Sequence, residues 1–397
     1  MKHRSNLFAC ACACALLTAP SAFAITYYWD TNGSTTGGSD SSAADGFWNG
    51  RNWSNNSAGT SSTSYVTTAN TDTVIFSAGT NVTGSSSVSL GVDQVVGNIT
   101  FEEGAVTISG NKTLTLGNSS GNAVITANNY QDSITSVIAG ASNSLTKSGT
   151  GMLYLTAANT YTGATVVSAG FLFIQNGSNL GSTGNGTSVT AGATLALTGG
   201  VTIGDEALTI NGIGRNSNGA LFSLNGNNTY GGTITLGSNS VINSGGYTLS
   251  LTSATAISGN YGLTFTGAGN TIVTSAIETG TGGLVKSGSG TLTLSGVSTY
   301  TGGTTVVGGS LKGTTASIQG AVVNNAAVEF NQADNGTYAG AMSGTGSLSK
   351  TDVGVLTLSG ANTYAGGTTV SAGSLKGTSA SIQGAVVNNA AVEFNQA

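Results

Sequence analysis

Apolar residues along most of this chain alternate with polar ones in short runs. The run Thr291 to Leu294 reads Thr-Leu-Thr-Leu, so Leu292 and Leu294 share one face of an extended strand and the threonines share the other. No helical periodicity follows the first 24 residues. The pattern predicts many short β-strands, with Leu292 and Leu294 facing inward. The same alternation recurs at Leu114/Leu116, Leu195/Leu197, Leu208/Ile210, Leu249/Leu251 and Leu263/Phe265.

Two kinds of internal repeat organise these strands. One block is copied almost unchanged, since Ser374 to Ala397 repeats Ser310 to Ala333 with the single difference of Thr315 to Ser379. A second motif runs from Lys286 to Val306 as Lys-Ser-Gly-Ser-Gly-Thr-Leu-Thr-Leu-Ser-Gly-Val-Ser-Thr-Tyr-Thr-Gly-Gly-Thr-Thr-Val. Repeated use of one unit indicates a repeat architecture rather than a globular enzyme. The motif has two more good copies and a decayed one, whose tyrosines are Tyr161, Tyr364 and Tyr230.

The composition favours an all-β fold in which these strands stack as a right-handed parallel β-helix. Glycines such as Gly288 and Gly290 would supply corners with φ > 0, and threonines can bond to neighbours on adjacent rungs. Proline, which interrupts a ladder, occurs once, at Pro20. With roughly 20–25 residues per turn, the chain would form about 15–18 coils. An array of β-sandwich domains of about 64–70 residues is the alternative, which the scarcity of proline and of Asn-Gly hairpin signals disfavours.

The start of the chain has the features of a secretory signal. Lys2 and Arg4 precede an apolar stretch, and Ala22-Phe23-Ala24 offers a cleavage site. Its removal would take all three cysteines, the single histidine and the single proline. Without them the mature chain could build no disulfide, Cys/His zinc site or Ser-His-Asp triad, so we expect no metal, cofactor or catalytic residue. We expect a signal peptide at 1–24, a Trp-rich N-terminal cap region at 25–80 and a β-solenoid at 81–397, with the best repeat copies at 144–167, 283–333 and 347–397.

Charge is sparse and negative. Hydrophobic residues make up 38% of the chain and charged residues 6%, which argues against disorder. Removing Lys2 and Arg4 from the ten basic residues leaves eight against 15 acidic ones, a net charge of −7, so we expect no nucleic-acid partner. The repeated tyrosines are interpreted as corner packing, with ligand stacking as the alternative. Five repeated lysines are interpreted as surface gatekeepers against edge aggregation rather than a polyanion-binding ladder: Lys147, Lys286, Lys312, Lys350 and Lys376.

All three tryptophans of the chain, Trp29, Trp48 and Trp53, lie near the start of the mature sequence. Clustered indoles can stack on sugar rings, which makes these residues the candidate ligand site. Solenoids also need their ends covered, so the same cluster could close the first coil. We interpret it as an aromatic cap and keep sugar binding as the alternative.

Some β-helices cleave acidic polysaccharides, which requires carboxylates gathered on one coil face with a nearby base. The adjacent acidic pairs are Glu102-Glu103 and Asp205-Glu206, and Arg215 follows the second. Neighbouring residues on a strand point to opposite faces, so neither pair forms a dyad by itself. We interpret both pairs as solvated surface groups. A polysaccharide-active enzyme or a carbohydrate-binding β-helix remains the alternative function.

The motif from Lys286 to Val306 resembles the autotransporter-associated β-strand repeat, also called the passenger-associated transport repeat. The copy that begins at Leu348 departs from it at Thr351-Asp352-Val353-Gly354, where one corner glycine is replaced. The resemblance implies a secreted, non-enzymatic β-helical passenger on the cell surface, associated with the outer membrane. Its implied role is structural display with adhesion.

The resemblance also implies partners. Surface glycans or extracellular matrix would be the adhesion targets, and such passengers often carry a C-terminal outer-membrane barrel. No series of ~10-residue amphipathic strands closes this sequence, and its last block stops partway through a repeat. We therefore expect either a fragment of a longer gene product or a different mode of anchoring. A final coil without a neighbour would favour self-association at that end.

Overall fold

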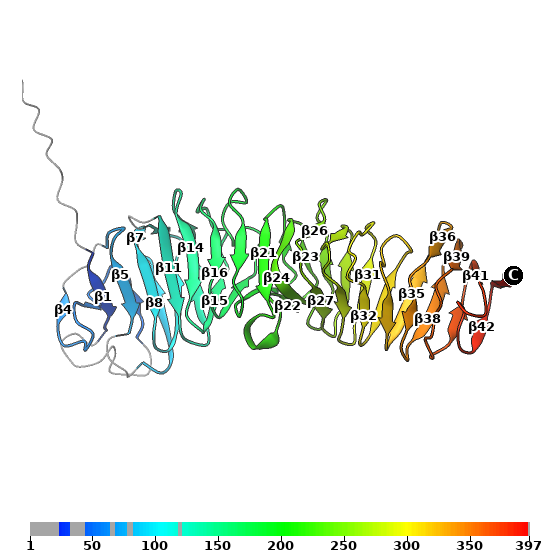
Figure 1. Cartoon of the computed structure of the whole chain (residues 1–397). Helices are drawn as coiled ribbons and strands as arrows, with labels where there is room; N and C mark the ends of the chain where they lie inside the picture. Colours follow the sequence, from blue (N-terminus) through cyan, green and yellow to red (C-terminus); the bar gives the residue numbers. More distant parts are fainter. Residues whose placement is uncertain (1–23, 32–43, 64–67, 78–81, 118–120, 396–397) are drawn as a thin grey trace, which may run out of the picture.

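The computed structural model describes residues 24–31, 44–63, 68–77, 82–117 and 121–395. Over these residues the chain forms an elongated parallel β-solenoid of about 15 turns, with its first strands at one end and its last at the other (Figure 1). The expected parallel β-helix is thereby confirmed, while its handedness stays a prediction. The signal peptide expected at 1–24 lies outside the described residues, apart from Ala24.

The described strands form four sheets along the rod. The largest holds β1 (Thr26–Trp29), β2 (Gly46–Phe47), β3 (Trp53–Ser54), β4 (Ser62–Thr63), β5 (Thr73–Phe76), β6 (Ser85–Ser89), β8 (Asn98–Phe101), β9 (Ala105–Ser109), β11 (Asn122–Ala127), β12 (Asp132–Ile134), β14 (Ser144–Ser148), β15 (Met152–Leu155), β16 (Thr165–Val167), β17 (Phe171–Ile174), β18 (Thr187–Val189), β19 (Thr194–Thr198), β21 (Leu208–Gly212), β22 (Leu221–Asn225), β24 (Ile234–Asn243), β26 (Ile257–Ser258), β27 (Leu263–Thr266), β29 (Ile277–Glu278), β30 (Leu284–Lys286), β32 (Thr304–Val306), β34 (Val322–Asn324) and β37 (Met342–Ser343).

Three smaller sheets complete the walls of the solenoid. One contains β7 (Gln94–Val96), β10 (Leu114–Leu116) and β13 (Ile138–Ala139). The second contains β20 (Thr202–Ile203), β23 (Asn228–Tyr230), β25 (Leu249–Leu251), β28 (Thr271–Val273), β31 (Thr291–Leu294), β33 (Ser310–Gly313), β35 (Ala327–Asn331), β38 (Ser347–Thr351), β40 (Thr368–Val370) and β42 (Val386–Asn388). The third contains β36 (Gly336–Tyr338), β39 (Val355–Leu358), β41 (Ser374–Gly377) and β43 (Ala391–Phe394).

Consecutive coils pair in register, which stacks similar side chains along the rod. β31 pairs in parallel with β28 and β33, so Leu292 lies between Thr271 and Leu311. Leu292 and Leu294 are 0% and 3% exposed, whereas Thr293 between them is half-buried. The inward assignment of the two leucines is confirmed. Among the described strands, the antiparallel pairs are β1 with β3 and β3 with β4, both near the N-terminus.

The corners between strands depend on glycine for two different reasons. Gly288 has a φ of +72°, a left-handed conformation that side chains resist. Gly290 is not in that region, and a Cβ there would lie 1.8 Å from the carbonyl oxygen of Gly269 in the preceding coil. The expectation of a positive φ at Gly290 is therefore wrong. The residue is glycine because two backbones approach closely.

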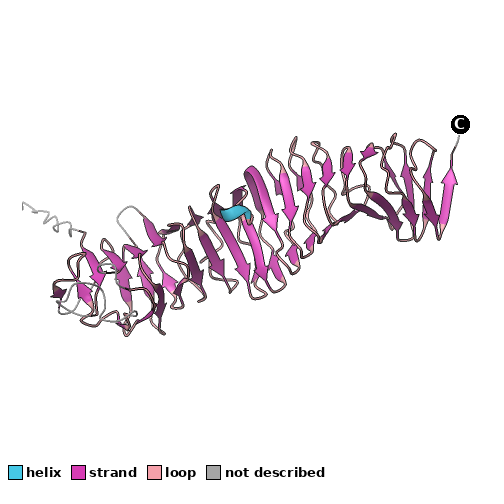
Figure 2. Cartoon of the chain, turned by 90° about the horizontal axis from the view of Figure 1, so that it is seen from below, coloured by secondary structure: helices cyan, strands magenta, loops and turns pink. Residues whose placement is uncertain are grey.

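One loop breaks the regular outline of the rod. It joins β21 to β22, protrudes from the side of the solenoid in Figure 1, and contains the 3-10 turn η1 (Arg215–Ser217), cyan in Figure 2. η1 is the one helical segment in the described part of the chain. Within these same ranges no helix has the length and hydropathy needed to cross a membrane.

The N-terminal region is continuous with the solenoid. β1 pairs in parallel with β5, and β5 pairs in parallel with β8, so the ladder runs from the Trp-rich segment into the coils that follow. The domain boundary placed at residue 80 stays a prediction.

Candidate functional site

The three tryptophans form a buried aromatic cluster. Trp29, Trp48 and Trp53 are 2%, 0% and 0% exposed. The ring centroid of Trp53 lies 4.9 Å from that of Trp29 and 5.3 Å from that of Trp48, with Phe76 beneath all three at 5.5 to 5.8 Å. The indole nitrogen of Trp29 donates to the carbonyl of Ala44 at 2.7 Å. These contacts suit a cap at the end of the core, and sugar stacking on the rings, which stays a prediction, would require the cluster to open.

Three repeated lysines lie inside the solenoid. Lys147, Lys286 and Lys350, here called the corner lysines, are 0%, 3% and 0% exposed. Their interpretation as surface gatekeepers is wrong. The sequence contained a signal for this placement, because Lys286 follows the inward Leu284 by two positions on β30 and therefore shares its face.

Each corner lysine uses its ammonium to bind backbone carbonyls at a corner. The Nζ of Lys286 donates to the carbonyls of Ser287 at 2.6 Å, Gly288 at 2.8 Å and Gly308 at 3.0 Å. Two of these carbonyls belong to its own coil and the third to the next coil. Lys147 makes the same contacts at 2.7, 2.9 and 3.1 Å. Three acceptors match the three hydrogens of an ammonium, so the side chain joins successive coils at the point where the chain turns.

Burial perturbs the titration of these groups. It lowers the pKa of Lys147 to about 7, while nearby Asp132 acts in the opposite direction. Burial also lowers the pKa of Lys286 and of Lys350. Asp132 is itself 0% exposed, and burial raises the pKa of its carboxyl to about 6. The coil around Lys147 therefore holds two ionisable groups whose charged forms are costly.

The other two repeated lysines lie on the outer wall. Lys312 on β33 pairs with Glu329 on β35 at 2.8 Å, and Lys376 on β41 pairs with Glu393 on β43 at the same distance. Each partner lies directly opposite on the next rung. These two lysines are half exposed and make cross-rung ion pairs, which the sequence interpretation did not foresee.

The repeated tyrosines pack inside the corners, as expected. Tyr161, Tyr300 and Tyr364 are each 2% exposed, and Tyr230 is fully buried. The phenolic oxygens of the first three lie 2.6 to 2.8 Å from the hydroxyl of the threonine four residues later. Tyr230 instead donates to the carbonyl of Glu206 at 2.8 Å. These buried contacts confirm corner packing rather than ligand stacking.

The acidic pairs do not converge on a catalytic centre. Asp205 is exposed, whereas Glu206 is 2% exposed and accepts a hydrogen bond from the Thr187 hydroxyl at 2.7 Å. The interpretation of Glu206 as a solvated surface group is therefore wrong, and burial raises its pKa. Glu102 is exposed, while Glu103 accepts from the Val82 amide at 3.2 Å. Across the described ranges there is no group of three or more His, Cys, Asp or Glu side chains suited to a metal ion.

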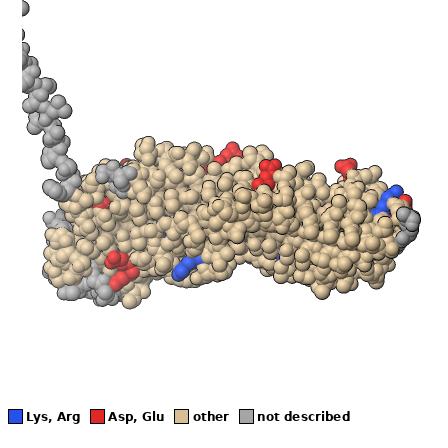
Figure 3. All heavy atoms as spheres, viewed as in Figure 1, with Lys and Arg blue, Asp and Glu red and all other residues tan. Residues whose placement is uncertain are grey.

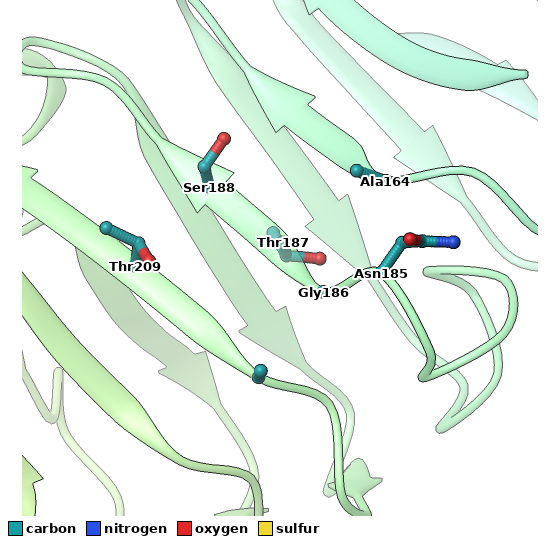
Figure 4. Close-up of a pocket in the computed structure, with 7 residues that line it drawn as sticks. Ala164, Asn185, Gly186, Thr187, Ser188 and Thr209 are labelled. Carbon is teal, nitrogen blue, oxygen red and sulfur yellow. The ribbon is translucent and has the colours of Figure 1, made fainter.

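Three surface cavities lie at or beside the second acidic pair and Arg215. Figure 4 shows one of about 150 Å³, where Asn185, Thr187, Ser188 and Thr209 lie on and beside neighbouring strands, and its lining carries no ionisable side chain. Asp205 lines another cavity with residues 231–233 and 253–255. Arg215 lines neither of these and lies instead in a third cavity with residues 128–130 and 150–152. The structure therefore does not bring Arg215 to the same cavity as the Asp205-Glu206 pair.

Comparison with known proteins agrees with the motif found in the sequence. Three segments match the passenger-associated transport repeat, at residues 145–172, 284–312 and 348–376. Each segment begins at an inward leucine, includes one corner lysine and ends on the second strand after the repeated tyrosine. The resemblance drawn from the sequence is confirmed for these segments.

One curated relative is the "Adhesin BmaC autotransporter" of Brucella suis biovar 1 (strain 1330). It is 40% identical over 189 residues, which cover 46% of this chain and 5% of the relative. The chain thus matches a small part of a much longer protein. No solved structure matches the chain.

Proposed function

We propose that this chain is part of the passenger of an autotransporter-like surface protein, with a structural role in display and adhesion. One observation carries the proposal. The three transport-repeat segments lie in a continuous parallel solenoid, and each contains a corner lysine that joins successive coils. The similarity to an autotransporter adhesin supports the same role. We propose export through the expected signal at 1–24 and display at the cell surface, in association with the outer membrane.

The solenoid has physical properties that suit projection from a cell. Its rungs repeat the same backbone pairing, so length can grow without a new core. Charged side chains are few on the face shown in Figure 3, which leaves a mostly uncharged wall. A rod of this kind would hold a binding surface away from the envelope, with glycans or extracellular matrix as the proposed targets.

We propose that the passenger is not an enzyme. The carboxylates of the acidic pairs point to different environments, with Glu206 inside the coil and Asp205 outside. Most glycoside hydrolases use a pair of such groups at one substrate position. The ionisable groups of the repeats are used for packing, as the corner lysines show.

Two measurements test this function. Antibodies raised against the mature chain, residues 25–397, should label intact cells, and external protease should remove the label. Beads coated with the mature chain should adhere to immobilised matrix protein or cell-surface glycan more than beads coated with albumin. A chain found only inside intact cells, or beads that adhere no better than the control, would contradict the proposal.

A further inference from the structure

A cavity on the side of the solenoid lies between the protruding loop and the coils that precede it. Its volume is about 270 Å³, close to the lower end of the ~300–1,000 Å³ range of small-molecule sites. Its lining comes from the segment between β11 and β12, from β15, from β17 and from η1. The side chains that matter here are those of Asn128, Asn129, Tyr130, Met152, Phe171 and Arg215.

The fold holds Arg215 at this cavity through its backbone. Thr194 on β19 is 0% exposed, and its hydroxyl accepts a hydrogen bond from the Arg215 amide at 2.8 Å. The same hydroxyl donates to the carbonyl of Gly219 at 2.8 Å, and the Gly219 amide donates to the carbonyl of Ile213 at 2.8 Å. The loop is thus closed on itself and fixed to the sheet beneath, so the position of Arg215 is built into the fold.

The floor of the cavity belongs to a stack of aromatic side chains on the outer wall. Phe171 and Phe173 are 5% and 3% exposed although both point away from the coil interior. The ring of Phe173 lies 4.4 Å from that of Tyr154 and 5.6 Å from that of Phe171, in near-parallel stacks. Tyr130 at the rim is 73% exposed. A rigid apolar floor and an open aromatic ring are therefore placed side by side.

The charge at the cavity is positive. The ion pairs among the described residues are Lys312–Glu329 and Lys376–Glu393, so Arg215 takes part in neither. The ammonium of Lys147 lies beneath the same corner, where it binds the carbonyls of Ser148 and Gly149. The nearby carboxyl of Asp132 is fully buried and does not line the cavity. Its Oδ1 accepts from the Val106 amide at 3.2 Å and from the Asn129 side chain at 3.4 Å, while its Oδ2 has no hydrogen-bond partner among the described residues. An unpaired guanidinium on an otherwise weakly charged wall favours an anionic ligand.

We propose that this cavity binds a carboxylated sugar unit of an acidic glycan. Arg215 would pair with the carboxylate, since its planar fork matches that group. Tyr130 would stack on the sugar ring, and the amides of Asn128 and Asn129 would bond its hydroxyls. The size of the cavity suits one or two sugar units better than an extended acidic peptide. This proposal deepens the proposed function, on which its biological use rests, by giving an adhesive passenger a ligand class.

The test uses the mature chain, residues 25–397, with three probes: 3′-sialyllactose, trigalacturonic acid and neutral lactose. Titration calorimetry should show binding of at least one acidic probe, with lactose at least about tenfold weaker. Arg215→Gln should weaken the acidic probe about tenfold or more, and Tyr130→Ala several-fold. Lys112→Gln and Tyr247→Ala, exposed residues outside the cavity, should bind like the unchanged chain.

Failure of both acidic probes to bind, or equal binding by Arg215→Gln, would overturn the proposal. Tighter binding of a polyglutamate peptide at Arg215 would replace the glycan with an acidic protein partner. Surface labelling and sugar binding are measured separately, on the unchanged chain and on Arg215→Gln, so that the display role and the glycan site can fail independently. A chain that is displayed but binds neither acidic sugar loses the glycan site alone, whereas one that binds sugar but never reaches the surface loses the display role alone.

Discussion

The coils from residue 284 to 394 and those from 171 to 243 use the same solenoid in different ways. In the first region the contacts are copied, so that the ion pairs Lys312–Glu329 and Lys376–Glu393 both measure 2.8 Å. In the second region the register shifts between Leu197 and Thr198, and the loop with η1 is inserted after β21. Copied contacts maintain the rod, whereas the inserted loop adds a surface that the copied coils lack.

The outer wall shows the difference most clearly. In the repeated region the outward positions of β31 carry threonine, which favours strands and can face solvent. In the interrupted region the outward positions of β17 carry Phe171 and Phe173, which are buried. The strict alternation of inner apolar and outer polar residues is therefore lost at β17, where the outward side chains are buried as well.

The largest expected effect comes from breaking the alternation in the repeated region. Leu292→Asp would place a carboxylate among buried leucines and should cost on the order of 5 kcal/mol of unfolding free energy. Thr293→Asp, on the outer face, should cost less than about 1 kcal/mol. Hydrogen exchange of β31 in each variant measures the loss locally. Equal and small losses in both would reverse the inward and outward assignment.

The next largest effect is expected at the aromatic stack on the outer wall of the interrupted region, if these rings are packed as tightly as a core. Phe173→Ala should cost about 3–4 kcal/mol, as truncation of a core aromatic does, although the residue lies on the outer face. The matched outward change in the repeated region, Thr293→Ala, should cost only a few tenths of a kcal/mol. Chemical unfolding followed by exchange at β17 and β31 compares them. Similar values at the two positions would show that the aromatic stack is not a packed core.

Much of the strand pattern could be predicted from the sequence, because the inward or outward direction of a side chain on a strand alternates from one residue to the next. Leu292 and Leu294 were assigned correctly for that reason. The position of Lys286 was missed because charge was expected to require water, although its spacing from Leu284 indicated the inner face. The ligand cavity could not be found at all, since Tyr130 and Arg215 are distant in sequence and meet only once the coils are stacked in register.

A smaller effect separates the two kinds of repeated lysine. Lys286→Met keeps the buried stem but leaves three carbonyls without their donor, which should cost about 1–3 kcal/mol. Lys312→Met removes a half-exposed ion pair and should cost less than about 1 kcal/mol. Exchange at β30 and β33 reports each loss where it occurs. A greater cost for Lys312→Met would contradict the structural role assigned to the corner lysines.

The smallest expected effect is a dependence on pH near Lys147, outside the copied region. Its pKa of about 7 in the folded chain is below that of a free lysine, so between pH 7 and 9 the unfolded chain binds more protons. Unfolding free energy should therefore rise with pH over that window, by on the order of 1 kcal/mol. Asp132 acts oppositely at lower pH, because its folded pKa of about 6 exceeds the ordinary value and stability falls as pH rises from about 4 to 6.

Urea unfolding at pH 5, 7 and 9 measures this dependence on the unchanged chain. The window stops at pH 9 because burial raises the pKa of Tyr161 and Tyr300, so stability should fall once tyrosines of the unfolded chain ionise. Lys147→Met should flatten the rise between pH 7 and 9, leaving the smaller contributions of Lys286 and Lys350, whose pKa values are also lowered. An undiminished rise in Lys147→Met would mean that the ammonium at this corner is not the group that titrates, and that its three carbonyl contacts hold it charged throughout the window.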